Sequence, residues 1–166
     1  MRSPLLILGI SLFICPILSA QSDQIPKNSV KLNGHLFIVP EGYTVESAIL
    51  PKLARFPVNG CFDEQGRLYI TDVSGTNAKV TDQLVEKPHR ILRLEDTNGD
   101  GVFDKAIEFA DKLSFPEGIL VHRGSVYVSC PPSILKLTDT DADGIADKRE
   151  TWLDAKTLTG CANDLH

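Results

Sequence analysis

The chain has 166 residues, of which 42% are hydrophobic and 23% charged, and its 17 basic and 22 acidic side chains give a formal net charge of −5. This composition is typical of a globular protein and excludes a disordered chain. No cluster of lysine or arginine occurs, which argues against a nucleic-acid partner. The four cysteines form no CxxCH pattern, so this stretch attaches no c-type haem.

Residues 1–20 have the pattern of a secretory signal peptide: one arginine, an apolar run, and small residues before a cleavage site after Ala20. A lipoprotein signal that uses Cys15 is the alternative, although the residue before this cysteine is not small. Both interpretations predict an exported protein, periplasmic or associated with the cell envelope. No later stretch is apolar enough to cross a bilayer.

Residues 21–55 are predicted to be an N-terminal extension, and residues 56–166 contain a repeat. The decapeptides DTNGDGVFDK (96–105) and DTDADGIADK (139–148) lie 43 residues apart. Around them, segment 90–111 matches segment 133–154. Each segment begins with the apolar–polar alternation of a half-buried strand, passes through an Asp/Gly loop, and enters a second candidate strand. Segments 66–72 and 124–130 add a further matched strand after a tight turn.

Four strands in about 40–45 residues are the size of a β-propeller blade. The predicted fold is therefore all-β, a partial β-propeller with about two four-stranded antiparallel blades and the start of a third. Segment 66–72 precedes its match by 58 residues, so the first unit is predicted to carry an inserted loop over residues 72–89. Because propellers typically have about 4–8 blades, we expect this chain to be the N-terminal part of a longer protein.

The two Asp/Gly loops are candidate calcium sites, because alternating oxygen-bearing side chains around a glycine turn can surround one hard cation. The second loop follows the EF-hand pattern as far as its bidentate glutamate, whereas the first has Ile107 at that position, so tighter binding is expected at the second. Alternatively, these side chains only stabilise hairpin turns. The candidate ligands are Asp96, Asn98, Asp100 and Asp104 in the first loop, and Asp139, Asp141, Asp143, Asp147 and Glu150 in the second.

Three cysteines, Cys61, Cys130 and Cys161, remain after the predicted cleavage, and an odd number does not make a closed disulfide framework. Cys61 and Cys161 each follow a glycine, which suggests matching buried positions where a free thiol packs as a small hydrophobe. A single disulfide among the three is the alternative in an oxidising compartment.

Several segments, among them RFPVNGCFDEQGRLYITDVSG, EKPHRILRLEDTNGDGVFDK and LTGCANDLH, resemble the PVC-type membrane-bound dehydrogenase and haem-binding proteins. The N-terminal propeller of that family is similar to quinone-dependent sugar and sorbosone dehydrogenases. The resemblance implies a sugar, alcohol or aldehyde substrate and a pyrroloquinoline quinone cofactor. It also implies that electrons pass to a cytochrome c domain outside this stretch.

The resemblance further implies a catalytic role for His166, at the end of GCANDLH. A histidine suits a general base, because its pKa lies near neutrality and it can take the hydroxyl proton as hydride leaves the substrate. An ordinary structural histidine is the alternative. A second hypothesis for the whole chain is a non-catalytic, calcium-stabilised propeller that binds carbohydrate or protein, since propellers host both kinds of function. In either case the fragment alone is expected to be inactive.

Overall fold

The structure, a computed structural model, describes residues 27–154, and the chain divides into two compact units, residues 1–45 and 46–166. In the first unit, β1 (Ser29–Leu32) and β2 (His35–Ile38) form an antiparallel hairpin. Its turn residues Asn33 and Gly34 have φ values of 49° and 81°, the geometry that matches the twist of the flanking strands. The predicted signal peptide lies outside the described residues. Within the described range, no helix is both long and apolar enough to cross a membrane.

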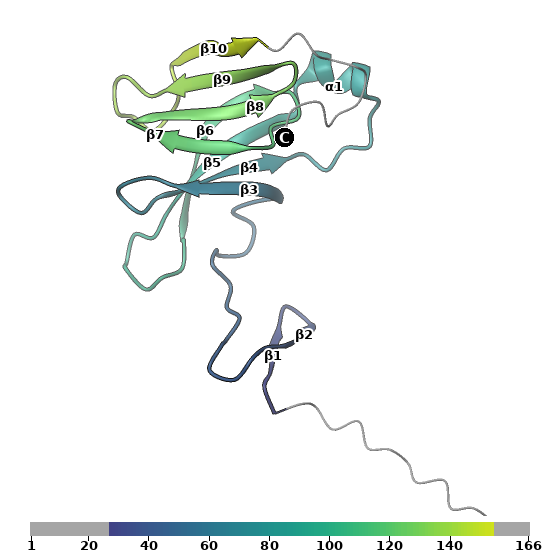
Figure 1. The fold of residues 1–166 in the computed structure, drawn as a ribbon, viewed down its shortest axis with the longest axis vertical. Coiled ribbons are helices and arrows are strands. Elements are labelled where there is room, and N and C mark those ends of the chain that lie inside the picture. Colours follow the sequence, from purple (N-terminus) through teal and green to yellow (C-terminus); the bar gives the residue numbers. More distant parts are fainter. Residues whose placement is uncertain (1–26, 155–166) are drawn as a thin grey trace, which may run out of the picture. The chain divides into compact units, whose positions relative to one another are not determined.

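The second unit contains two four-stranded antiparallel sheets in which consecutive strands are neighbours (Figure 1). This arrangement confirms the predicted four-stranded antiparallel sheets, with each Asp/Gly loop between two consecutive strands. The first sheet contains β3 (Phe56–Phe62), β4 (Leu68–Val73), β5 (His89–Glu95) and β6 (Lys105–Leu113), and the second contains β7 (Ile119–His122), β8 (Ser125–Cys130), β9 (Ser133–Thr138) and β10 (Lys148–Asp154).

The two sheets share a core that forms between their facing sides. The backbone N–H of Ala146 donates a 2.7 Å hydrogen bond to the carbonyl of Phe109 across the two sheets. Arg149 of β10 also donates to Asp111 of β6, at 2.7 Å to the backbone carbonyl and 2.8 Å to the carboxylate. These contacts hold the second sheet in a fixed position on the first. The core includes Tyr69, Ile91 and Phe109 from the first sheet and Val126, Val128 and Leu137 from the second.

Residues 46–55 cover part of the opposite face of the first sheet. Ile49 makes a parallel bridge with Phe103, and Ile49 and Ala54 pack against the apolar cluster on this face. The N–H of Phe103 donates to the carbonyl of Ala48 at 2.9 Å, and the N–H of Leu50 donates back to Phe103 at 3.0 Å. This short segment therefore makes apolar contacts with the sheet and backbone contacts with the loop between β5 and β6. The cluster that it covers consists of Ile70, Leu92, Leu94 and Phe103.

The insertion between β4 and β5 contains a short helix, α1 (Val80–Glu86), which the sequence analysis did not predict. His89, at the start of β5, is buried and holds the insertion from both ring nitrogens. Its Nδ1 accepts a hydrogen bond from the N–H of Ser74 at 3.1 Å, so its Nε2 is the donor to Gln83 Oε1 at 3.1 Å. Gln83 in turn donates to the carbonyl of Ala78 at 2.7 Å. The insertion is thus an ordered part of the unit.

Cys61 and Cys130 are both free thiols, and Cys161 lies outside the described residues. The Cys61 sulfur accepts a 3.5 Å hydrogen bond from the N–H of Val121 in the second sheet. Cys130 is buried, and this burial raises its pKa to about 12. Cys130 is therefore protonated at neutral pH and packs as a small hydrophobe.

Candidate metal-binding loops

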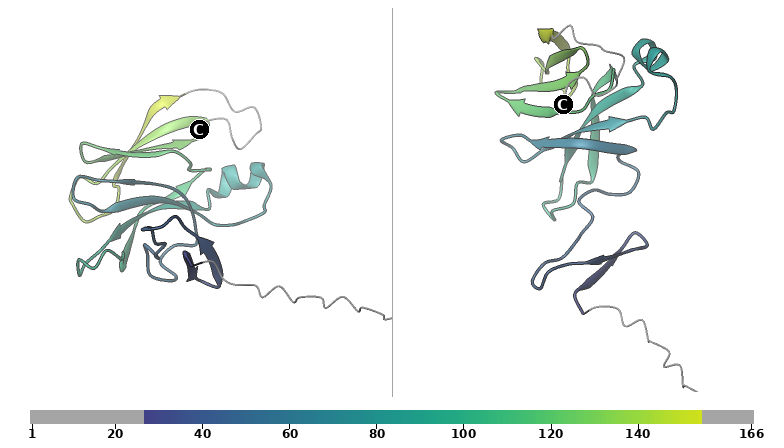
Figure 2. Two further views of the ribbon diagram at one scale, coloured as in Figure 1. Left: turned by 60° about the horizontal axis from the view of Figure 1, so that its bottom comes forward. Right: turned by 45° about the vertical axis from the view of Figure 1, so that its right-hand side comes forward.

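The two Asp/Gly loops lie at the same end of the two sheets, opposite α1 (Figures 1 and 2). Residues 96–104 join β5 to β6, and residues 139–147 join β9 to β10. Strands flank both loops, so neither has the helices of an EF-hand. The acidic clusters are therefore positioned by sheet hairpins of the same design.

In the first loop, acidic side chains accept hydrogen bonds from the backbone. Asp96 accepts from the N–H of Gly99 at 2.7 Å and of Gly101 at 2.8 Å. Asp104 accepts from the N–H and the hydroxyl of Thr97, at 3.0 and 2.7 Å. The Asp96 bonds favour the ionised carboxylate, and the one from Gly101 contributes most to lowering its pKa. The loop conformation and the charge of Asp96 therefore depend on each other.

The second loop repeats this hydrogen-bond pattern. Asp139 accepts from the N–H of Ala142 at 2.7 Å and of Gly144 at 2.8 Å. Asp147 accepts from the N–H of Thr140 at 3.0 Å and also from its hydroxyl, which is the main cause of the lowered pKa of Asp147. These contacts agree with the turn-stabilising interpretation. They also leave lone pairs on the carboxylate oxygens, so the same side chains keep the capacity to bind a cation.

The second loop brings three of the predicted metal ligands together. One carboxylate oxygen each from Asp139, Asp141 and Asp143 lie within 4.8 Å of one another. Asp139 is half-buried, and the other two are exposed. In the first loop, Asn98 stands where the second has Asp141, so the corresponding set there has two carboxylates and one amide oxygen. Calcium prefers six to eight oxygen ligands, and each loop could supply some of them.

The remaining predicted ligands have other partners. Glu150 lies on β10, where its carboxylate is 3.1 Å from Lys148 Nζ, and it is not part of the three-carboxylate group. Asp104 and Asp147 bind the threonines Thr97 and Thr140. Asp100 accepts a 2.8 Å hydrogen bond from the N–H of Val102. The proposed catalytic residue His166 lies outside the described residues.

Arg93, on β5 of the first sheet, is a buried residue at the second loop that the sequence analysis missed. Its side chain is 9% exposed; one guanidinium nitrogen lies 2.8 Å from Glu95, and another lies 4.0 Å from an Asp139 carboxylate oxygen. Its Nε is buried and has no hydrogen-bond partner among the residues that the structure describes. A Cβ at Gly144 would lie 2.7 Å from the guanidinium, so this close approach requires glycine. Because the contact crosses between sheets, no local sequence signal indicates it.

The chain belongs to the family described as "Domain of unknown function (DUF7133)", which matches residues 29–164. Two solved structures are similar to it, an iodide structure and a calcium structure of Trichoderma reesei Carbohydrate-Active Enzymes Family AA12. Each is 20% identical, with TM-scores of 0.44 and 0.43 over 63% and 65% of this chain. The chain spans about a quarter of those structures, 24% and 25% of their length. No curated protein matches the chain.

Proposed function

We propose that this chain is the first part of a β-propeller in an exported, quinone-dependent dehydrogenase-like protein that oxidises a sugar or another alcohol or aldehyde. The observation that carries the propeller proposal is the repetition of one four-stranded antiparallel sheet, with consecutive strands adjacent and equivalent Asp loops at one end. The dehydrogenase proposal rests on the resemblance of the motifs in the same repeats. Electrons would pass to a cytochrome module of the full-length protein.

Calcium is the cation that we propose for the Asp loops. The convergence of Asp139, Asp141 and Asp143 within 4.8 Å supports it, because three carboxylate oxygens are hard ligands and two of these side chains are open to solvent. A cation there would offset the mutual repulsion of the three carboxylates. Its proposed role is to stabilise the hairpin between β9 and β10.

Pyrroloquinoline quinone is an anionic cofactor that cationic side chains would bind. Four arginines of the second unit already lie within 4.0 Å of protein carboxylates, so these four are not free to hold it. We therefore propose that the quinone site lies outside residues 27–154, and no catalytic step is assigned to the described residues. The four arginines are Arg67, Arg90, Arg93 and Arg149.

The test of the dehydrogenase proposal is dye reduction by the full-length protein supplied with quinone, calcium and a panel of sugars and aldehydes. His166→Ala should lower turnover by about 10²–10⁴-fold, the usual contribution of a general base, while folding stays intact. His35→Ala is the control, because His35 is exposed on β2 and lies outside the groove on β7–β10, so it should leave turnover unchanged. Unchanged turnover in His166→Ala would remove this residue from the mechanism.

A non-catalytic propeller that binds carbohydrate or protein is the second candidate. It is favoured by the hydrogen bonds within both Asp loops. These bonds give the aspartates a structural role, so the aspartates need no part in redox chemistry. Absence of turnover on every sugar and aldehyde by the quinone-loaded full-length protein would support this candidate. Retention of a carbohydrate ligand by that inactive protein would then identify the binding role.

A further inference from the structure

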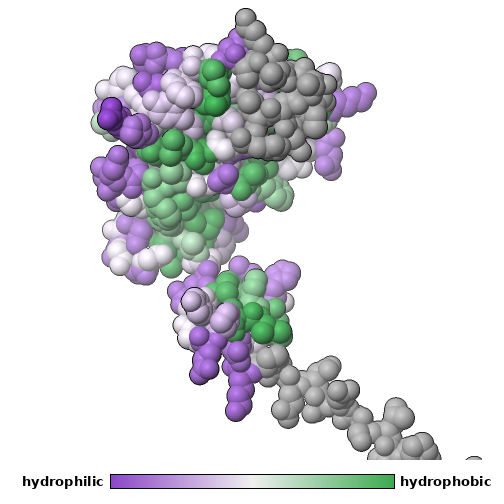
Figure 3. Space-filling model, viewed as in Figure 1, coloured by the Kyte–Doolittle hydropathy of each residue, from purple (hydrophilic) through white to green (hydrophobic). Residues whose placement is uncertain are grey.

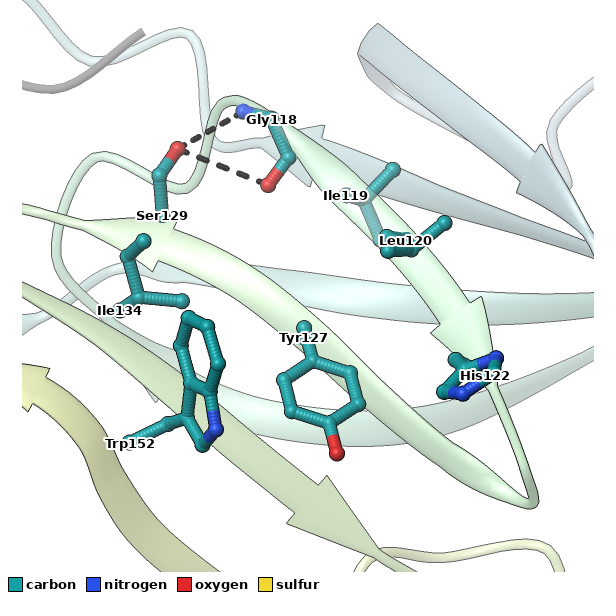
Figure 4. A pocket seen from close by; sticks show the side chains of 8 residues that line it. All are labelled: Gly118, Ile119, Leu120, His122, Tyr127, Ser129, Ile134 and Trp152. Atoms are coloured by element: carbon teal, nitrogen blue, oxygen red, sulfur yellow. Dashed lines mark hydrogen bonds between the residues drawn. The ribbon is translucent and has the colours of Figure 1, made fainter.

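One face of the second sheet is apolar and open to solvent. Figure 3 shows apolar side chains gathered on the surface of the sheets, and Figure 4 shows a groove on β7–β10 lined by aromatic and aliphatic side chains. The groove has a volume of about 470 Å³, and Leu120, Tyr127, Ile134 and Trp152 line it. Trp152 is 61% exposed and Leu120 56% exposed. An exposed apolar surface of this kind commonly marks an interaction site.

These side chains reproduce, position by position, the face that the first sheet turns toward the second. Along the repeat, Tyr127 corresponds to Tyr69, Ile134 to Ile91 and Trp152 to Phe109. Leu120 pairs with Tyr127 across β7 and β8, as Cys61 pairs with Tyr69 across β3 and β4. The exposed face of the second sheet therefore repeats the face of the first sheet that the second sheet covers.

The geometry of the aromatic pair is also repeated. The rings of Tyr69 and Phe109 meet edge to face, with centroids 5.1 Å apart and an angle of 86° between their planes. The rings of Tyr127 and Trp152 meet in the same way, at 5.5 Å and 81°. Both pairs stand beside a register shift, between Ile91 and Leu92 on β5 and between Thr151 and Leu153 on β10. The backbone irregularity that presents the ring is thus conserved between the two repeats.

In the first sheet the core residues of this face are buried. Ile91 is 0% exposed and Phe109 2% exposed, because the second sheet covers both. The covering side chains are the aliphatic residues Val126, Val128 and Leu137. The complement of the aromatic face is consequently the aliphatic face of a four-stranded sheet.

We propose that the exposed face of β7–β10 is the docking surface for a third four-stranded sheet of the same repeat, which follows β10 in the same polypeptide. The inference rests on the propeller part of the proposed function, and it stands whether or not the protein is a dehydrogenase. A second copy of this chain would not offer an uncovered aliphatic sheet face of this kind. Of the aliphatic faces in the described part of the chain, residues 46–55 cover that of the first sheet, and the first sheet covers that of the second.

The test uses Trp152, which is the single tryptophan of the chain and lies on this face. A further copy of residues 114–154 replaces residues 157–166, because residues 113 and 156 are equivalent in the 43-residue repeat. In the appended copy, phenylalanine replaces tryptophan. We expect a blue shift of Trp152 emission and a several-fold fall in acrylamide quenching relative to the unextended chain, at every protein concentration.

A matched variant of the extended chain carries Leu120→Lys in its original repeat. Leu120 is exposed, so the substitution should leave the two existing sheets folded and should reverse the shift of Trp152 emission. An appended copy that is folded by circular dichroism but leaves Trp152 exposed would overturn the proposal. An appended copy that stays unfolded would overturn it too, because a complementary surface should order it. A concentration-dependent shift in the unextended chain would instead show that a second copy occupies the face.

Discussion

The guanidinium of Arg93, on β5 of the first sheet, lies 4.0 Å from a carboxylate oxygen of Asp139, in the loop of the second sheet. Glu95 pairs with the arginine at 2.8 Å, and Gly144 leaves room for the guanidinium because it has no side chain. A fixed positive charge therefore stands behind the three-carboxylate cluster. It faces Asp139 in particular, and it should repel an incoming cation.

Removing this charge should strengthen calcium binding at the second loop. Arg93→Gln is expected to raise the affinity about fivefold, because removing one partly screened positive charge beside the site is worth on the order of 1 kcal/mol. Glu95 keeps an ion pair with Lys105 at 2.9 Å, so it is not left unpaired. Calcium titration by calorimetry measures the effect. Lys136→Gln, the equivalent position in the second sheet, is the control, and an equal gain in both variants would contradict the mechanism.

Exchanging the side chains at the equivalent positions 98 and 141 should also exchange the relative calcium affinities of the two loops. Asp141→Asn should weaken calcium binding at the second loop about tenfold, and Asn98→Asp should strengthen it at the first, because ligand charge sets the affinity of such loops. Both substitutions preserve the oxygen that accepts the hydrogen bond of Asp100 or Asp143, so the turns stay intact. Thermal unfolding in calcium and in chelator separates the two effects. If Asp141→Asn lowered the unfolding temperature equally in calcium and in chelator, this carboxylate would only stabilise the turn.

Stability should depend on pH through His89. Burial lowers the pKa of His89, so the unfolded chain takes up the proton at a higher pH than the folded chain does. The free energy of unfolding should therefore fall as the pH drops below about 6.5, with a slope of at most about 1.4 kcal/mol per pH unit. Urea unfolding between pH 8 and 5 measures this slope. His89→Gln should reduce it, whereas the exposed His122→Gln should not; an unchanged slope in His89→Gln would contradict the assignment.

The thiol of Cys130 should not react with alkylating reagents in the folded protein. Its pKa of about 12 and its burial leave almost no accessible thiolate at pH 8. Iodoacetamide labelling followed by peptide mass spectrometry should therefore modify Cys130 only after urea unfolding. Cys61, which is partly exposed, is the internal comparison and should react first. Labelling of Cys130 at the same rate as Cys61 would show that this region opens readily.

The strands and both Asp loops were predictable because their signals are local and occur twice. Alternating side chains mark β5 and β9, and the Asp/Gly spacing marks the turn that follows each of them. The short helix α1 carried no comparable signal. Seven residues are too few for a clear helical period, and tertiary contacts through Gln83 and His89 hold it in place.

The environment of the candidate metal ligands was less predictable than the loops themselves. Spacing alone placed Glu150 in the ligand set, but β10 continues past the loop and pairs Glu150 with Lys148. Arg93 lies 46 residues before Asp139 in the chain, and only the packing of the two sheets brings them together. Similarly, the exposure of Trp152 and the burial of its equivalent Phe109 follow from which faces are covered, which a linear pattern does not record.

The contacts of residues 46–55 with the first sheet have a consequence for how the protein behaves at high concentration. A molecule with one exposed aromatic face and one exposed aliphatic face would bind the next molecule head to tail, and such an interface does not close unless the rotation forms a ring. Ile49 and Ala54 occupy the aliphatic face within the same chain. We therefore expect this ten-residue segment to disfavour head-to-tail association through that face.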